Sequence, residues 1–398
     1  MLNIDEPKVE QKLAIFNSGF RIFFLSAGLF AVISMLLWLV NYSLNVDVGV
    51  KGFFTVTWHA HEMIYGYAMA VVSGFLLTAV TNWTNRKTLT GKSLSLMFVF
   101  WLLARASAFL ALENNVEMMF LFDSLFLIML LTGISLPVMK SRQWSQISII
   151  LVVFLILLSN TLFYAGQLGF VDGTERTGLY AGFYLILLLV LILSRRVIPF
   201  FIEKGVDNDF VPANKIWVDK LVLPLFIGFI TLDIFDINSA AISILAALLF
   251  VLNLLRVSNW YSHAIWSKPL LWILILAYSF ITLGFLLKAV AYVTDMSELI
   301  ILHLFAVGGV SLITLGMMSR VALGHTGRNV FDPPAVVFWI FVSIVLAVIF
   351  RVLFPMFFGG YYLQWILLSQ LFWIVAFTIF CISYSVMLLK PRIDGRPG

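Results

Sequence analysis

The sequence predicts an all-α fold, a polytopic transmembrane bundle of about twelve helices that forms a single integral membrane domain. Three observations predict it. Of the 398 residues, 62% are hydrophobic and only 11% are charged, whereas soluble domains carry about 25% charged residues. Apolar stretches of about 20 residues, each long enough to cross a lipid bilayer as a helix, recur along the chain. Basic residues gather in alternate connections between these stretches, which supports the count independently.

Each expected helix is an apolar stretch bounded by charged or turn-forming residues. Residues 1–21 form a polar segment before the first stretch, and residues 390–398 form a tail after the last. The stretch that begins at Ile22 is too long for a signal-peptide core and lacks a small-residue cleavage site, so we expect it to remain as the first helix. Only Asp236-Ile237-Asn238 separates the seventh helix from the eighth. The expected spans are residues 22–43, 60–82, 94–113, 118–139, 146–168, 177–200, 217–236, 238–257, 269–293, 298–320, 334–354 and 363–389.

Charge placement orients the bundle. With the N-terminus in the cytoplasm, twenty of the 25 basic residues fall in the tails and on one side of the membrane, which the positive-inside rule makes cytoplasmic. Both termini are therefore expected in the cytoplasm. The net charge of +5 reports this orientation and gives no reason to expect a nucleic-acid partner. The twenty residues are Lys8, Lys12, Arg21, Arg86, Lys87, Lys92, Lys140, Arg142, Arg195, Arg196, Lys204, Lys215, Lys220, Arg256, Lys268, Arg320, Arg328, Lys390, Arg392 and Arg396.

The sequence also excludes several kinds of site. Cys381 is the only cysteine, so disulfides and thiolate clusters are excluded. No C-x-x-C-H motif occurs, so any haem is held non-covalently. The chain contains no Gly-rich phosphate loop, Ser–His–Asp motif or nucleotide fingerprint.

Polar and ionisable side chains inside the expected helices gather in the half of the bundle that faces away from the cytoplasm. A charged group in a membrane costs several kcal/mol, so each one motivates a functional hypothesis. At 1.5 Å of rise per residue, these side chains come from separate helices to a similar depth. They are His59, His61, Glu62, Arg105, Asp123, Asn160 and His303.

A metal or cofactor site explains this pattern, with His59, His61 and His303 as candidate ligands. Neutral imidazole is a common ligand for haem iron, copper and zinc. Side chains two residues apart on a helix point about 200° away from each other around the helix axis. His59 and His61 can therefore share one metal only if one of them lies in the non-helical turn that enters the helix. Thr57 as N-cap would place both in the first turn. Glu62, on the face of His59, would orient a ring or deliver protons as a catalytic group.

Other interpretations stay open for these residues. A single histidine at a membrane interface is more often solvated or hydrogen-bonded than bound to metal, and His263 is expected to be an ordinary loop residue. Arg105 either pairs with Asp123 or contacts a haem propionate. The stretch "GMMSRVALGHTGRN" (316–329) carries three further candidates for binding a cofactor propionate or another anion, and is alternatively a capped helix end followed by a basic loop. These candidates are Arg320, His325 and Arg328.

A weak internal repeat connects the two histidine-bearing spans. Shifting the chain by 242 residues places His61 on His303, with matching glycines and a matching Thr and Arg further along. Both spans run in the same direction through the membrane, so an axis along the membrane normal would relate them. If the repeat is real, His61 and His303 lie at equivalent depths, where they could flank one haem.

At this point the residues resemble a known family. The stretches "GFRIFFL" (19–25), "WHAHEMIYGYAMAVVSGFLLTAVTNWT" (58–84), "WLLARA" (101–106), "RRVIPFF" (195–201) and "MMSRVALGHTGR" (317–328) are similar to signatures of the NnrS family. The resemblance implies a twelve-helix protein of the bacterial inner membrane that contains haem and copper and serves nitric oxide tolerance. The motif positions are His59, His61, Glu62, Arg105, His303 and His325. The chain departs from the family at Ile275, where a histidine is common.

We therefore expect a multi-pass inner-membrane protein that carries non-covalent haem b, with copper as an optional second metal, and that binds or detoxifies nitric oxide. A nitric oxide reductase-type enzyme is an alternative, although the sequence contains no recognisable electron-entry module. A transporter of a small metabolite or metal is the alternative from a different class, since twelve helices and a repeat suit one. A haem-dependent sensor or an assembly factor is a third. Besides nitric oxide as a small-molecule ligand, the only partner that the sequence indicates is the surrounding lipid bilayer.

Overall fold

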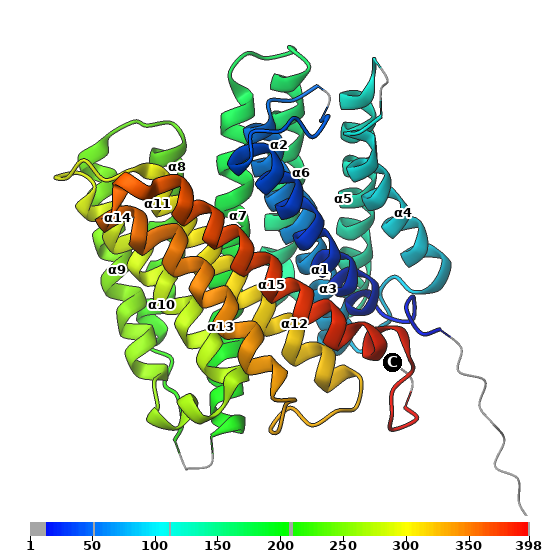
Figure 1. Cartoon of the computed structure of the whole chain (residues 1–398). Helices are drawn as coiled ribbons and strands as arrows, with labels where there is room; N and C mark the ends of the chain where they lie inside the picture. The colour runs from blue at the N-terminus through cyan, green and yellow to red at the C-terminus, as the bar shows by residue number, and fades with distance from the viewer. Residues whose placement is uncertain (1–12, 51, 111–112, 207–209, 397–398) are drawn as a thin grey trace, which may run out of the picture.

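The chain folds entirely into helices and connecting loops over the part that the structure describes (Figure 1). The structure is a computed structural model, and it describes residues 13–50, 52–110, 113–206 and 210–396. Within these ranges there is no β-strand. The predicted all-α fold is therefore confirmed.

The helices follow one another with short connections, and several spans are built from more than one helical segment. The first half contains α1 (Gly19–Trp38), η1 (Leu39–Ser43), α2 (Thr55–His61), η2 (Glu62–Ala68), α3 (Met69–Thr84), α4 (Gly91–Ser107), α5 (Asn115–Lys140), η3 (Trp144–Gln146), α6 (Ile147–Gln167) and α7 (Thr174–Gly205). The second half contains α8 (Ile216–Ile234), α9 (Ser239–Trp260), η4 (His263–Ser267), α10 (Pro269–Val290), α11 (Glu298–His303), η5 (Leu304–Ser311), α12 (Leu312–His325), α13 (Val336–Val348), η6 (Ile349–Leu353), α14 (Phe354–Phe357), η7 (Gly359–Tyr361) and α15 (Tyr362–Leu389).

Ten of these spans are long and apolar enough to cross a membrane, counted over the described residues. The other two expected spans are helical as well, but α4 has only 17 residues and α8 carries three charged side chains along its length. The narrow separation between α8 and α9 is confirmed, because Asn238 caps α9 by accepting a hydrogen bond from the Ala241 N–H at 3.0 Å. The chain is thus a multi-pass membrane protein, and the count of twelve crossings stays a prediction.

Five spans form the centre of the bundle and the others surround them. The central spans are α1–η1, α2–η2–α3, α7, α10 and α11–η5–α12. In their most apolar stretches 67–72% of the residues are buried, against 33–44% in the other candidate spans. In Figure 1 α1 lies beside α15 and packs against α3 on another side, and α10 lies beside α9. The outer helices expose large apolar residues such as Ile244 on α9 and Ile382 on α15, as expected for side chains that face lipid. Both histidine-bearing spans therefore belong to the protected centre.

The two ends of the described chain meet at the same end of the bundle. The Ala14 N–H donates to the Leu389 carbonyl at 2.8 Å. Arg21, fully buried on α1, donates from Nη1 to the carbonyls of Met387, Leu388 and Lys390 at 3.2, 3.1 and 2.6 Å. These bonds satisfy carbonyls that the end of α15 leaves without partners. The first and last described segments thus lie together, and the cytoplasmic location of both termini stays a prediction. We call the opposite end, where α2 and α11 begin, the outer end.

Candidate functional site

A cavity of about 490 Å³ lies near the outer end of the bundle, between α1–η1, α2–η2, α7, α11–η5, η6 and α15. Most of its wall is apolar or aromatic, and His59, His303 and Arg351 contribute polar groups to it. Val56 and Leu299 also line the cavity and are 62% and 53% exposed. The cavity therefore reaches the surface of the protein at an apolar rim.

All four π-helical segments of the described chain contribute to the wall of this cavity. Tyr42 comes from η1, Met63 from η2, Val307 from η5 and Arg351 from η6. A π-helical turn has i→i+5 hydrogen bonds, is rare, and occurs frequently at functional sites. The clustering of four such segments around one space makes this cavity the candidate functional site.

The two spans that a 242-residue shift aligns have the same irregular construction. In α2–η2–α3 the π-helical segment begins directly after His61, and in α11–η5–α12 it begins directly after His303. An α–π–α order in both spans supports the internal repeat. The repeat does not place its two aligned histidines in one site, however, because His59 rather than His61 lines the cavity with His303.

Hydrogen bonds set the tautomer of His303. Its Nδ1 lies 2.7 Å from the carbonyl oxygen of Leu299, one helical turn earlier. A carbonyl only accepts, so Nδ1 carries the proton and Nε2 keeps its lone pair. The Arg351 Nη2 lies 3.1 Å from Nδ1 and 3.2 Å from Nε2, and of these two nitrogens only Nε2 can accept from it. His303 is thus held in the tautomer that a metal requires at Nε2.

His59 is fixed by ring stacking. Its imidazole lies parallel to the indole of Trp38, with 4.3 Å between the ring centres and 8° between the planes. Its Nδ1 is buried and has no hydrogen-bond partner among the described residues. Buried polar nitrogens without a partner are rare and indicate a bound ion, water or ligand.

The N-cap expected at Thr57 is wrong. The helix α2 begins at Thr55, with Phe54 as its N-cap residue, so both histidines lie within the helix. The rotation of about 200° between them then sends them to different places. His59 faces the cavity, whereas His61 is fully buried in a separate cluster of charged side chains.

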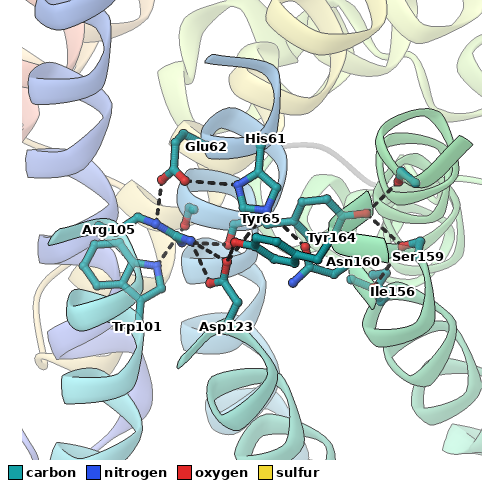
Figure 2. Close-up of polar contacts among 12 residues, drawn as sticks. His61, Glu62, Tyr65, Trp101, Arg105, Asp123, Ile156, Ser159, Asn160 and Tyr164 are labelled. Carbon is teal, nitrogen blue, oxygen red and sulfur yellow. Dashed lines mark hydrogen bonds and ion pairs between the residues drawn. The ribbon is translucent and has the colours of Figure 1, made fainter. Parts of the chain in front are cut away.

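That cluster joins α2, η2, α4, α5 and α6 through charged contacts (Figure 2). Arg105 lies 2.5 Å from Glu62 and 2.6 Å from Asp123. The His61 Nδ1 lies 3.0 Å from Glu62, and its Nε2 lies 3.0 Å from the Asn160 oxygen. All five side chains are at least 95% buried. Both ring nitrogens of His61 are already engaged with acceptors, so the arrangement favours a structural role for His61.

The helix α4 also supports the irregular backbone of η2. The Trp101 Nε1 donates to the Gly66 carbonyl at 3.0 Å, and the Arg105 Nη1 donates to the Tyr65 carbonyl at 3.4 Å. Gly66 leaves space for the ion pair, since a Cβ there would lie 2.8 Å from a carboxylate oxygen of Glu62. The alternative that Arg105 pairs with Asp123 is confirmed. The binding of a propionate by Arg105 stays a prediction, and the structure places Arg105 outside the cavity wall.

Arg320, His325 and Arg328 lie at the opposite end of the bundle and do not line the cavity. The Arg320 guanidinium lies 4.0 Å from the centre of the Phe201 ring, and His325 packs against Phe20. Partial burial lowers the pKa of Arg328. This arrangement resembles a capped helix end followed by a basic loop, and an anion-binding role for these residues stays a prediction.

The chain's C-terminal tail covers His325. Arg392 donates to the His325 carbonyl at 3.0 Å and to the Asp394 carboxylate at 2.9 and 2.6 Å. These bonds hold the pKa of Asp394 below its usual range. His263, expected to be an ordinary loop residue, lies exposed in η4.

Sequence reasoning missed three side chains of the cavity. Arg351 lies in the eleventh expected span, and its charge inside an apolar stretch was a usable signal. Gln370 on α15 and Trp38 on α1 gave no such signal, because single amides and indoles are common in membrane helices. Their proximity to the histidines arises only from the packing of distant helices.

Comparison with known protein families relates the chain to one of them. The model of a family described as NnrS protein matches residues 14–392, which is nearly the whole chain. No curated protein matches the chain.

Proposed function

Because the chain belongs to the NnrS family, we propose that it is a haem-containing protein of the bacterial inner membrane that binds nitric oxide and protects the cell from it. The observation that carries the proposal is the cavity into which His59 and His303 project from two irregular helices. Nitric oxide is small and uncharged, so an apolar cavity with an apolar rim inside a membrane suits its entry.

The residues present fit a haem. The volume of about 490 Å³ lies within the range of roughly 300–1,000 Å³ that is usual for ligand and cofactor sites. The wall is apolar and aromatic, and two imidazoles reach it from different helices. The buried Nδ1 of His59 lacks a partner among the described residues, which is the property of a side chain that a bound group completes. His303 and His59 would hold the iron.

The protein's own side chains would fix the ligands. The bond from the His303 Nδ1 to the Leu299 carbonyl fixes the ring orientation and increases the basicity of Nε2. The stack on Trp38 restricts rotation of the His59 ring. When bound, the haem iron would supply the site that takes up nitric oxide, once one of the two imidazoles has left it. Binding of iron by the Nε2 of His303 requires the Arg351 side chain to turn away from that nitrogen.

Copper is the less supported part of the proposal. The described residues contain no group of three or more His, Cys, Asp or Glu side chains that could hold a metal ion. Met35 and Met63 line the cavity together with the two histidines, and thioether and imidazole ligands together suit Cu(I). A copper ion would have to use these sulfur atoms.

Turnover of nitric oxide would need protons, and Glu62 is the proposed donor. Its carboxyl group lies in the ion cluster, and the next two residues, Met63 and Ile64, line the cavity. Glu62 would first have to take up a proton from the outer side and loosen its ion pair with Arg105 before it could pass that proton toward the cavity.

A transporter is the second candidate function, because one observation favours it. Two aligned spans with irregular helices near one cavity resemble the broken helices that form transporter binding sites. The binding of a cofactor distinguishes the two functions. A transporter has no need of haem.

The test is the optical spectrum of the full-length protein purified in detergent, oxidised and dithionite-reduced, with metal analysis of the same sample. We expect a Soret band whose position shifts on reduction and again when nitric oxide is added. His303→Ala and His59→Ala should weaken or shift the band, and His263→Ala should leave it unchanged. A sample with neither haem nor metal would overturn the proposal and favour transport.

A further inference from the structure

We propose that Arg351 and Gln370 form a carboxylate-binding subsite in the cavity, which would take a propionate of the bound haem. This inference rests on the proposed function for the identity of the ligand. The existence of the subsite is argued from charge and hydrogen bonding alone.

Arg351 is a buried cation without a countercharge. It is 9% exposed, and among the described residues no carboxylate forms an ion pair with it. Three other buried cations have a carboxylate partner, whereas Arg21 bonds to backbone carbonyls and Arg320 lies over the Phe201 ring, and neither of these two lines the cavity. Arg105 has Glu62 and Asp123 at 2.5 and 2.6 Å, and Lys288 has Asp233 at 2.7 Å.

Arg256 gives a third comparison, since it pairs with Asp219 at 2.6 Å. Burying an unpaired charge in a low-dielectric interior is costly, and proteins avoid it unless a partner completes the site. Arg351 lines the cavity. The missing negative charge is therefore expected from the ligand of the cavity.

Two buried N–H groups on the cavity wall lack acceptors. Neither the Arg351 Nη1 nor the Gln370 Nε2 has a hydrogen-bond partner among the described residues. Gln370 is 4% exposed, and its oxygen accepts a hydrogen bond from the Ser43 hydroxyl at 2.7 Å. That bond turns the amide so that its NH₂ remains available. Both side chains line the same cavity, so they can serve one acceptor group.

The chemistry of these donors selects a carboxylate. A guanidinium binds a carboxylate through charge-assisted hydrogen bonds that are about twice as strong as neutral ones. The hydroxyl-bearing Tyr42 and Tyr362 also lie beside Arg351 and line the cavity. The rest of the wall is largely apolar, so the ligand has an acidic edge and a broad apolar body. A haem with its propionates has this character.

The position of the subsite also orients the ligand. Tyr362 is the first residue of α15, and Ser43 is the last residue of η1, so this polar region lies toward the outer end. Tyr67, whose hydroxyl lies 2.8 Å from Thr314, belongs to the deeper wall. The acidic edge of the ligand would face the outer end, and its apolar body would extend inward.

The test compares two ligands that differ only in their carboxylates. Full-length protein, produced under haem limitation and purified in detergent, is titrated with iron protoporphyrin IX or with its dimethyl ester, and binding is followed by the difference spectrum. We expect the wild-type protein to bind the free acid about 10- to 100-fold more tightly than the ester, the usual effect of one or two charge-assisted hydrogen bonds.

The variants locate the preference. Arg351→Met should bind the acid and the ester equally, Arg351→Lys should recover part of the preference, and Gln370→Met should reduce it. Arg86→Met, which removes an exposed charge remote from the cavity, should keep it. Binding of the ester at wild-type affinity shows that a variant is folded. If Arg351→Met binds neither compound, the subsite is judged by the preference for acid over ester in the wild-type protein and by the loss of that preference in Gln370→Met.

Each outcome bears on the subsite. Equal affinity for acid and ester in the wild-type protein would overturn the subsite and leave the haem proposal intact. Retention of the full preference in Arg351→Met would also overturn it. If the wild-type protein binds neither compound, the haem proposal fails and the subsite fails with it.

Discussion

Replacement of Arg105 by methionine tests whether charge holds the buried cluster together. The guanidinium is 5% exposed and contacts two carboxylates that are each 1% exposed, at 2.5 and 2.6 Å. Removing one partner of a buried ion pair costs about 3–5 kcal/mol, because it leaves an uncompensated charge. Here two carboxylates lose the same partner, so we expect a cost toward the upper part of that range. It corresponds to at least a 100-fold change in the unfolding equilibrium constant.

The assay is unfolding of the purified protein by titration of a denaturing detergent into mild micelles, followed by circular dichroism. Arg86→Met is the matched control, since the same substitution at an exposed arginine should change stability by less than about 0.5 kcal/mol. Adding Asp123→Asn to Arg105→Met should recover part of the loss, because it removes one of the two stranded charges. Equal stability of Arg105→Met and Arg86→Met would refute the reasoning.

The same variant separates the two roles that the sequence allows for Arg105. The structure places this side chain in the ion cluster and outside the cavity wall. We therefore expect Arg105→Met to lose stability while it keeps the position of the Soret band. A variant of normal stability with a shifted band would instead favour contact with a propionate.

Three further predictions concern packing, the chain ends and topology. Gly182→Ala should destabilise the protein by about 1–3 kcal/mol, because a Cβ there would overlap with the Tyr65 hydroxyl. Gly228→Ala should be tolerated, since the nearest atom to a Cβ there would lie 3.6 Å away. Thermal unfolding of both variants checks this. Arg21→Met removes three hydrogen bonds to the end of α15 and should make the C-terminal tail a faster substrate for proteolysis than in the wild-type protein. The native cysteine is buried, so labelling reports on an introduced cysteine. Asn45→Cys should react with a membrane-impermeant maleimide on intact cells, and Asn85→Cys should react only after permeabilisation. The reverse pattern would contradict the predicted orientation.

The fold was largely predictable because its main determinant is local. A helix that crosses a membrane needs a long apolar stretch, and such stretches are visible without knowledge of their neighbours. The structure adds the four π-helical segments, which the sequence does not reveal, since one extra residue in a turn leaves the apolar composition unchanged. Gly308-Gly309 inside η5 and Gly66 inside η2 were the available hints, but glycine is frequent in membrane helices for other reasons.

The candidate site was predictable only in part, because it depends on which faces of distant helices meet. The sequence indicated that His59 and His61 share one metal only if one of them lies in the entry turn. The N-cap expected at Thr57 was wrong, because the N-cap residue is Phe54, three residues earlier. As a result His61 lies in the ion cluster, and His59 lines the same cavity as His303. These two histidines are far apart in the sequence, so no local pattern predicts that they share a cavity.

Arg351 shows how a small boundary error conceals a buried charge. The eleventh expected span ended at residue 354, three residues after Arg351. In the structure the span continues to Phe357, so Arg351 lies deeper and points its donors at the cavity. A buried charge without a sequence neighbour of opposite sign was the signal to follow.

The most direct test of the account is electron paramagnetic resonance of the ferric protein with the two cavity histidines replaced one at a time by glycine. We predict that His59→Gly and His303→Gly each change the iron signal of the wild-type protein, and that added imidazole restores it, because the lost ring leaves a space of its own size. His61→Gln should lower stability and keep the wild-type signal. An unchanged signal in both glycine variants, or a loss of the iron signal in His61→Gln alone, would contradict the account.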